Sequence, residues 1–170
     1  LMAGVLRGLQ KRRPALFNIY TPCPVEHGLP DDWAQHSARL ALESRAFPFV
    51  TFDPDAGRTW SECLNLDGNP SLDDDWPTYV DEGGEARTME LPLTTADWAA
   101  TEGRFRKHFK RLRDDETAEL VAFHEYLALA ADARDGKVPF IHMLGADRRL
   151  ERWTVAPEIV RLAEERQHYW

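Results

Sequence analysis

Cysteine is scarce in this sequence of 170 residues, which contains only Cys23 and Cys63. Two cysteines cannot build the disulfide framework on which small secreted domains depend, and the first residues lack the charged and then apolar pattern of a secretory signal. Long apolar runs are missing too, since none approaches the roughly 20 residues that cross a bilayer. These absences predict a cytoplasmic protein in a reducing compartment, with no membrane partner.

Positive charge is in the minority, with 21 lysines and arginines against 29 aspartates and glutamates and a net charge of −8. An acidic surface repels phosphate backbones, so we do not expect a nucleic acid as partner. The glycine-rich patterns that cradle phosphates, G-x-G-x-x-G and the P-loop, are absent as well. What is present is a chain that is 43% hydrophobic, long enough for one domain with its own core.

The first third of the chain centres on an apolar run over residues 15–20, which is followed by a cysteine held between two prolines. Apolar spacing predicts helices over 1–13 and 33–46 on either side of it. The run itself predicts a buried strand of a mainly parallel sheet, and Cys23 then lies in the loop at the carboxyl edge, where open α/β sheets gather ligands. This order of elements indicates the α/β fold class, with helices flanking the sheet.

The middle of the chain, residues 53–85, is rich in Asp, Gly, Pro and Asn and carries successive turn signals. We expect a long irregular acidic segment there, with a short strand over 47–52 before it and an extended arm over 86–93 after it. Residues 73–75 are all aspartate. Because consecutive side chains of an extended loop point in different directions, a solvated loop is favoured over a metal site.

The last third of the chain predicts regular elements. Thr94 or Thr95 caps a helix that has Asp97 in its first turn, and Pro157 opens the final helix. The expected elements are helices over 95–109, 116–134 and 158–170, and strands over 138–144 and 150–155 that are joined like a hairpin.

Cys23 and His27 form the one local pattern with obvious chemistry, a C-x-x-x-H spacing. A thiolate and an imidazole suit zinc or an iron-sulfur cluster, but a complete site needs more ligands than this loop provides. Cys23 could instead be a nucleophile with His27 as its base, although Glu26 and the following aspartates make the surroundings electronegative. It could also be a cysteine that only packs, as most isolated cysteines do. The residues alone leave these alternatives open.

Six segments, taken in order, resemble the C-terminal end of the large single-chain pyruvate:ferredoxin (flavodoxin) oxidoreductases. The segments are F-N-I-Y-T-P-C-P-V-E-H-G, F-V-T-F-D-P-D-A-G, L-N-L-D-G-N-P, T-A-D-W-A-A-T-E-G-R-F-R-K-H-F, D-G-K-V-P-F-I and A-P-E-I-V-R-L-A-E-E-R-Q-H-Y-W. The resemblance covers nearly the whole chain. Both ends of the sequence look cut, which we expect of a piece of a longer polypeptide.

The resemblance implies three regions. Residues 1–52 would be the end of a thiamine-diphosphate-binding α/β domain with a cluster-ligand loop, 53–93 the irregular acidic segment, and 94–170 a helical tail region. Cys23 occupies the position of the remote fourth ligand of the four-iron (4Fe-4S) cluster nearest the thiamine, whose other three ligands lie far upstream. Cys23 is thus the cofactor-binding and metal-binding residue that the resemblance assigns to this chain.

The parent enzyme would decarboxylate a 2-oxo acid on thiamine diphosphate and magnesium, pass electrons through iron-sulfur clusters to ferredoxin or flavodoxin, and transfer the acyl group to coenzyme A. The resemblance also implies a homodimer and contacts with the remainder of the parent polypeptide. The glycine-aspartate segment that holds magnesium and diphosphate is absent, as are the upstream cysteines, so this chain alone is not expected to be active. No catalytic residue is assigned to it.

The sequence departs from the family pattern at the cysteine loop. The family loop commonly runs C-I-N-H-G, whereas here C-P-V-E-H-G contains Pro24 and one more residue, which separates the position of His27 from that of the family histidine. The alternative function is a non-catalytic structural or subunit-interaction module without a metal, in which the acidic segment 53–85 and the aromatic residues make subunit contacts.

Overall fold

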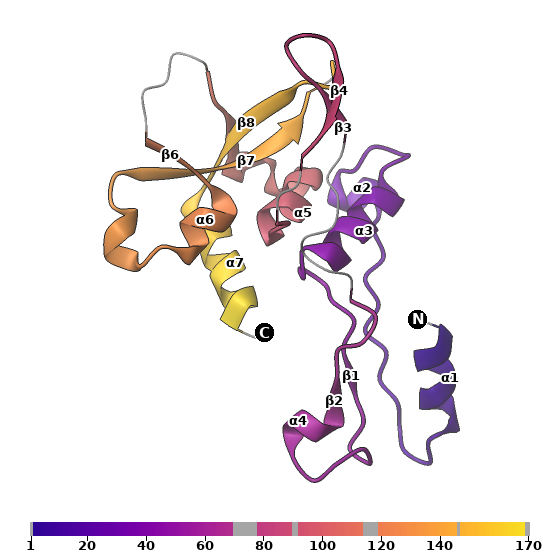
Figure 1. Cartoon of the computed structure of the whole chain (residues 1–170). Helices are drawn as coiled ribbons and strands as arrows, with labels where there is room; N and C mark the ends of the chain where they lie inside the picture. Colours follow the sequence, from indigo (N-terminus) through magenta and orange to yellow (C-terminus); the bar gives the residue numbers. More distant parts are fainter. Residues whose placement is uncertain (1, 70–77, 90–91, 114–118, 146, 169–170) are drawn as a thin grey trace.

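The structure is a computed structural model that describes residues 2–69, 78–89, 92–113, 119–145 and 147–168. Figure 1 shows a body in which helices pack beside a small sheet, with two thin hairpins that project from it in opposite directions. The helices are α1 (Met2–Gln10), α2 (Pro24–His27), α3 (Ala34–Glu43), α4 (Trp60–Cys63), α5 (Thr95–Thr101), α6 (Phe123–Ala128) and α7 (Pro157–His168), with 3₁₀ turns η1 (Gly103–His108) and η2 (Ala131–Arg134). Among the described residues, no helix has both the length and the apolar character to cross a membrane.

The main sheet contains β5 (Phe109–Arg111), β6 (Glu119–Ala122), β7 (Lys137–Leu144) and β8 (Leu150–Val155), in the order β5-β8-β7-β6. The pairs β5–β8 and β7–β8 are antiparallel, and only β6–β7 is parallel. The expectation of a mainly parallel sheet is therefore wrong for the described part of the chain. The reason is the short connection 145–149, because strands joined so closely pair as an antiparallel hairpin. The fold class is nevertheless mixed α/β.

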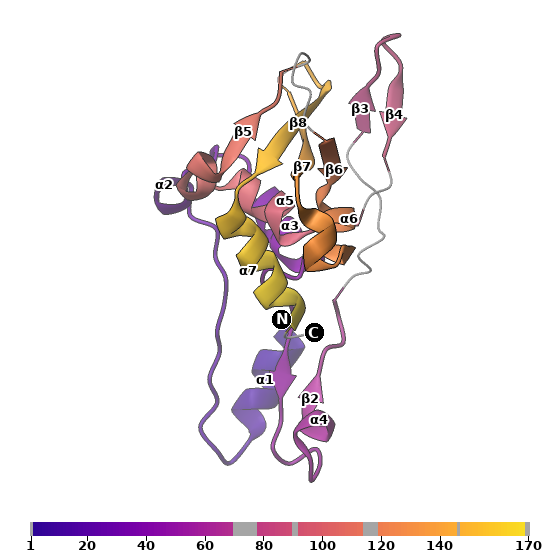
Figure 2. The ribbon, with the colours of Figure 1, turned by 90° about the vertical axis from the view of Figure 1, so that its left-hand side faces the viewer.

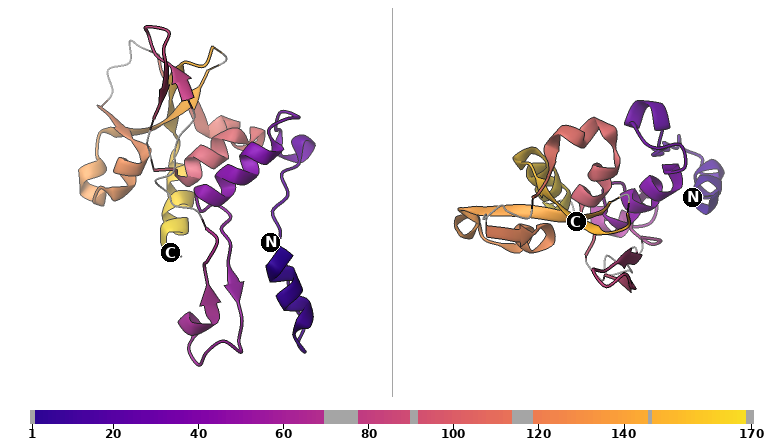
Figure 3. Two further views of the ribbon diagram at one scale, coloured as in Figure 1. Left: turned by 45° about the vertical axis from the view of Figure 1, so that its right-hand side comes forward. Right: turned by 90° about the horizontal axis from the view of Figure 1, so that it is seen from above.

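The core lies where α5 and α7 pack against each other and against the sheet. In Figure 2, α7 and α5 lie side by side at the base of the sheet, and Figure 3 shows α3 next to α5. Small residues on α5 and α7 let the helices approach closely. The most deeply buried apolar side chains are Ala41, Ala96, Ala99, Phe123, Ile159 and Ala163.

The lower hairpin pairs β1 (Thr51–Phe52) with β2 (Leu64–Asn65), and α1 lies beside it in Figure 2. Three ion pairs join the segment after α1 to the hairpin: Lys11 Nζ lies 2.7 Å from an Asp53 carboxylate oxygen and 3.6 Å from one of Asp55, and an Arg13 nitrogen lies 2.7 Å from Asp55. The second hairpin pairs β3 (Thr78–Val80) with β4 (Ala86–Thr88). The acidic segment thus contains short strands, while its aspartates 73–75 lie outside the described residues.

Several sequence expectations are confirmed. The helices expected over 1–13, 33–46 and 158–170 correspond to α1, α3 and α7, and the strands over 138–144 and 150–155 are β7 and β8. The capping residue of α5 is Thr94, with Asp97 at the third helical position, as the sequence indicated. Residues 169 and 170 of the final helix lie outside the described residues.

The buried strand expected over 15–20 is wrong. These residues are extended but pair with no strand among the described residues, and Leu16 and Ile19 are 94% and 54% exposed. An apolar run predicts burial only where a neighbouring strand or helix covers it, and here the residue of the run that packs against the core is Tyr20. Cys23 accordingly follows an unpaired extended segment instead of standing at the carboxyl edge of a sheet.

The long helix expected over 116–134 is also wrong. Residues 119–122 form β6, which pairs with Lys137–Phe140 of β7, and only then does the chain turn into α6 and η2. The backbone pairing with β7 outweighs a helical spacing of apolar residues, which is a weak signal by itself. Residues 116–118 lie outside the described residues.

The remaining expected elements are shorter than the sequence suggested. The strand over 47–52 is reduced to β1, and the arm over 86–93 is regular only in β4. The helix over 95–109 breaks after Thr101, because Glu102 is extended (φ −100°, ψ 122°) before η1 begins at Gly103. This break positions the Glu102 side chain inside the molecule.

Candidate functional site

Cys23 lies at the start of α2, a single helical turn that the sequence delimits at both ends. Pro24 occupies the first helical position, where its missing N–H costs nothing, and Gly28 ends the turn in the left-handed region with φ 64°. The Cys23 side chain is partly exposed, and Leu29, just after the turn, is buried. The turn therefore displays the cysteine at the surface while its other end is held in the core.

The turn is held through Glu102, whose side chain is completely buried. Oε1 of Glu102 accepts a hydrogen bond from the Tyr20 hydroxyl at 2.5 Å and lies 3.3 Å from Nδ1 of His27. Its second oxygen, Oε2, accepts from Nε of Arg104. Because a buried carboxylate is costly without partners, its contacts with Tyr20, His27 and Arg104 are what make its burial possible.

Tyr20 links this carboxylate to two helices. Its hydroxyl oxygen lies 3.1 Å from Oγ of Ser37 on α3 and accepts from Nε1 of Trp98 on α5 at 3.2 Å. Its ring stacks on the imidazole of His27, with centroids 5.8 Å apart and planes 11° apart. Burial, and then the hydrogen bond to Glu102, raise the pKa of Tyr20, which keeps it a donor at neutral pH. We call this set of residues the Glu102 cluster: Tyr20, His27, Ser37, Trp98, Glu102 and Arg104.

His27 connects the Glu102 cluster to the cysteine. The backbone N–H of Cys23 donates to Nδ1 of His27 at 3.4 Å, and the same nitrogen lies 3.3 Å from Glu102 Oε1. A ring nitrogen either accepts or donates, so Nδ1 serves Cys23 when it is unprotonated and Glu102 when it carries a proton. Nδ1 therefore contacts both neighbours but can form a hydrogen bond with only one of them at a time.

Two glycines let the cysteine turn come close to the chain after Glu102. A Cβ on Gly103 would lie 3.0 Å from the backbone oxygen of Gly28 and 3.1 Å from its Cα. A Cβ on Gly28 would meet Gly103 at 3.0 Å, and the positive φ of Gly28 also disfavours any side chain there. Both positions therefore require glycine for backbone contact.

The structure brings together only part of what the sequence singled out. Cys63 is buried on α4, where its thiol donates to the Gly57 carbonyl at 3.5 Å, so it belongs to the hairpin and not to the Cys23 turn. No group of three or more His, Cys, Asp or Glu side chains in the described ranges could hold a metal ion. Within those ranges, Cys23 can therefore supply one ligand to a metal centre and not a complete site.

The geometry also bears on the nucleophile alternative. His27 contacts Cys23 through the backbone N–H, and within the described residues no hydrogen bond joins the imidazole to the thiol. A nucleophilic cysteine needs a base within reach of its sulfur. The pairing suggested by the C-x-x-x-H spacing is thus real as a structural contact but lacks the contact that nucleophilic catalysis requires.

Glu102 is the residue that sequence reasoning missed. It occurs in the segment T-A-D-W-A-A-T-E-G-R, where a single glutamate before a glycine resembles any helix end. Its partners Tyr20 and His27 lie 82 and 75 positions earlier, so no spacing in the sequence joins them. The available signal was the glycine that follows Glu102, which marked a break in the expected helix.

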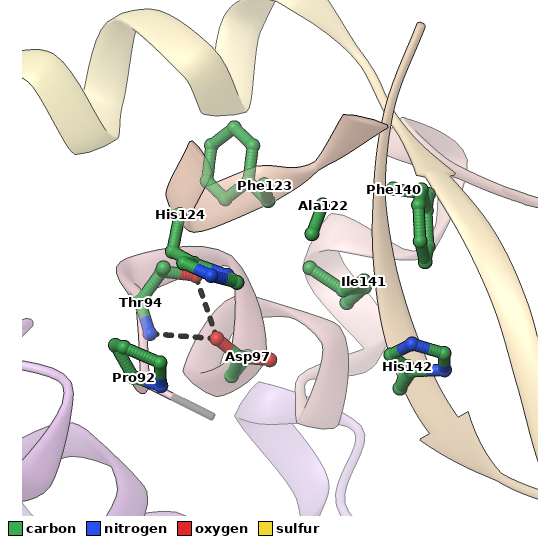
Figure 4. A pocket seen from close by; sticks show the side chains of 9 residues that line it. All are labelled: Pro92, Thr94, Asp97, Ala122, Phe123, His124, Phe140, Ile141 and His142. Atoms are coloured by element: carbon green, nitrogen blue, oxygen red, sulfur yellow. Dashed lines mark hydrogen bonds between the residues drawn. The ribbon is translucent and has the colours of Figure 1, made fainter. Parts of the chain in front are cut away.

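A second group of ionisable residues lies around the small cavity in Figure 4. Asp97, His124 and His142 line it, together with Phe123 of α6 and residues of β6 and β7. The Asp97 carboxylate accepts from both the backbone N–H and the hydroxyl of Thr94 at 2.6 Å. The cavity measures about 20 Å³, enough for one water molecule and not for a substrate.

The electrostatics of this cavity follow from burial. Burial raises the pKa of Asp97 to about 6, and it lowers the pKa of His142, which Arg152 lowers further. Nδ1 of His142 is buried and has no hydrogen-bond partner among the described residues. Asp97 therefore functions, together with Thr94, as the cap of α5 in a buried environment.

Comparison with family models, curated proteins and solved structures gives no significant match to this chain.

Proposed function

We propose that this chain is part of a pyruvate, or other 2-oxo acid, oxidoreductase that passes electrons to ferredoxin or flavodoxin, and that Cys23 supplies one thiolate to a 4Fe-4S cluster. The proposal rests on the ordered resemblance of six segments and on one structural observation. That observation is the position of Cys23 at the start of a single helical turn. The turn contacts the buried Glu102 through His27, and the cysteine is partly exposed. A remote cluster ligand needs both accessibility and a fixed position.

The donor set suits a shared cluster. Cys23 offers one soft thiolate, and the described residues offer no second cysteine nearby, so the other three ligands have to come from elsewhere in the parent. When bound, such a cluster would carry single electrons between the thiamine and the external carrier. The contribution of this chain is to hold one thiolate through the α2 turn. Thiamine diphosphate, magnesium, the 2-oxo acid and coenzyme A would be bound by the parent enzyme.

The test is the iron content and visible absorption of the anaerobically purified parent enzyme, compared for wild type, Cys23→Ala and Cys63→Ala. We expect Cys23→Ala to lose about one cluster of iron and absorbance. Cys63→Ala is the matched control, because Cys63 is buried on a separate hairpin and should leave the iron content unchanged. Full iron content and normal electron transfer in Cys23→Ala would refute the ligand role.

A second candidate function, a metal-free structural or subunit-interaction module, is favoured by a different observation. Large apolar side chains are exposed on α1 and on the extended segment after it. They are Met2, Leu6, Leu9, Leu16, Phe17 and Ile19. Exposed apolar residues that lie close together mark contact surfaces with other parts of a protein.

The substitution Leu16→Ser, compared with Cys23→Ala, distinguishes the two candidate functions experimentally. Leu16 is 94% exposed in this chain, so the substitution should leave the folded chain intact. In the parent enzyme, the interaction module predicts weakened assembly, measured by size-exclusion chromatography with light scattering, with no effect of Cys23→Ala on iron. The oxidoreductase function predicts that Cys23→Ala lowers the iron content, whether or not Leu16→Ser weakens assembly.

A further inference from the structure

A cavity of about 390 Å³ lies between the end of α3, the start of α5 and the last turns of α7, apart from the Cys23 turn. None of the residues of the Glu102 cluster lines it. Its apolar wall is formed by Leu66, Leu93, Leu127 and Ala163, and its charged groups are Arg45 and Arg166. The volume is that of a small-molecule site. We call it the two-arginine cavity.

The charge of the two-arginine cavity is opposite to that of the chain. The sequence carries a net charge of −8, yet among the described residues that line this cavity both ionisable side chains are arginines and none is a carboxylate. No carboxylate of the described residues forms an ion pair with Arg166. Two arginines and an apolar wall match a molecule that has an oxyanion at one end and a hydrocarbon body.

The backbone at Arg45 is a second, independent observation. Arg45 follows the end of α3 with φ 60°, in the left-handed region that glycine usually occupies at this position. Its N–H donates to the Leu42 carbonyl at 3.1 Å, and the Phe47 N–H donates to the Ala41 carbonyl at 2.7 Å, which closes the helix end. An arginine here costs backbone strain that glycine would avoid, and such strain is concentrated at binding sites.

We propose that the two-arginine cavity binds a small carboxylate or phosphate monoester with an apolar body, and that Arg45 and Arg166 bind its oxyanion. The neutral alcohol of the same length lacks the group that the arginines bind. The bare anion lacks the body that the wall of Leu93, Leu127 and Ala163 covers. Affinity therefore requires both parts of the molecule.

The test is a calorimetric titration of the purified chain with hexanoate, hexyl phosphate, hexan-1-ol and inorganic phosphate. We expect hexanoate, hexyl phosphate or both to bind, and the alcohol and inorganic phosphate to bind at least tenfold more weakly. Preference between the two anions identifies the carboxylate or the phosphate as the natural group. Binding of hexan-1-ol as tight as that of both anions, or of inorganic phosphate as tight as that of hexyl phosphate, would overturn the proposal, as would no binding by any probe.

The matched variants separate binding from folding. Arg45→Gly restores the residue that suits the left-handed backbone, so the variant should be at least as stable as wild type and still bind at least tenfold more weakly, about 1.4 kcal/mol. Arg166→Gln should weaken binding similarly. Arg161→Gln, an exposed arginine on the same helix that does not line the cavity, should bind like wild type. Unchanged affinity in both Arg45→Gly and Arg166→Gln would overturn the role of the arginines. None of these outcomes affects the test of Cys23.

Discussion

The hydroxyl of Tyr20 donates to the buried carboxylate of Glu102 at 2.5 Å, which joins the extended segment before Cys23 to the end of α5 across 82 positions of sequence. This bond fixes a stretch of chain that has no strand or helix of its own. The same carboxylate holds Arg104 and lies against His27. Glu102 therefore organises the part of the molecule in which Cys23 is found.

Glu102→Ala should lower the free energy of unfolding by about 2–3 kcal/mol, because it leaves the Tyr20 hydroxyl without its acceptor and opens a cavity. The guanidinium of Arg104 is partly exposed and finds water, so the loss stays below that of a fully buried ion pair. Urea unfolding followed by tryptophan fluorescence measures it. Glu165→Ala, at an exposed position of α7, is the control and should change stability by less than about 0.5 kcal/mol.

A double-mutant cycle isolates the bond itself. Tyr20→Phe removes the donor and Glu102→Ala removes the acceptor, and together they should show a coupling energy of about 1–3 kcal/mol. Additive effects would mean that Tyr20 and Glu102 are neighbours without a shared interaction.

Gly103→Ala should destabilise the chain by about 1–3 kcal/mol, because the new Cβ would meet the backbone of Gly28 at 3.0 Å and neither side is a flexible side chain. Gly4→Ala is the matched control. Gly4 lies inside α1 with no atom within 4 Å of a new Cβ, so alanine should stabilise that helix by up to about 1 kcal/mol. The pair of variants is measured by thermal unfolding, and equal effects would show that the contact between the glycines is not tight.

The fold was predictable where the signal is local. Pro157 and the hairpin of β7 and β8 depend on residues next to each other in sequence, and both were predicted. The run 15–20 failed because its burial depends on a neighbour that lies elsewhere in the chain or outside it. The helix over 116–134 failed for the related reason that β6 exists only because β7 is available to pair with it.

The candidate site was predictable only in part. The turn residues Pro24 and Gly28 surround Cys23 and indicate a short ordered loop, and its histidine is indeed in contact with the cysteine backbone. Glu102 could not be found, because a buried carboxylate is identified by its partners, and Tyr20 and His27 come from a segment far away in the sequence. The two-arginine cavity likewise joins helix ends that no local pattern relates.

Asp97 should make the chain lose stability as the pH rises from about 4 to about 6. Its pKa is raised from 3.8 to about 6 by burial, so the folded chain holds a proton in this range that the unfolded chain has released. The loss should reach about 3 kcal/mol above pH 6, and stability due to Asp97 should be constant beyond that. Partly exposed carboxylates such as Asp53 and Asp81 have lowered pKa values and act in the opposite direction.

The comparison that isolates Asp97 is therefore wild type against Asp97→Asn, unfolded in urea at a series of pH values. The asparagine oxygen still accepts from Thr94 but does not titrate. The free energy of unfolding of the variant should therefore rise relative to that of wild type as the pH increases from 4 to 6. A stability difference that does not depend on pH in this range would contradict the raised pKa.

His27 should control the accessibility of Cys23 through Nδ1. In a Cys63→Ser background, His27→Ala removes the acceptor of the Cys23 N–H and the stacking on Tyr20, so the turn opens more often. Loss of a hydrogen bond of about 1 kcal/mol corresponds to about fivefold more opening. The measurement is the rate at which iodoacetamide alkylates Cys23, together with the hydrogen exchange of its amide.

Two polar variants separate the role of Nδ1 from that of the ring as a whole. The side-chain amide of asparagine reaches the position of Nδ1, whereas that of glutamine reaches the position of Nε2. His27→Asn should therefore retain the bond to Cys23 and react within about twofold of the wild-type rate, while His27→Gln should react like His27→Ala at about fivefold. Equal rates in all of these variants would show that the turn is fixed by Pro24, Gly28 and the core alone, and that Glu102 does not act on the cysteine through His27.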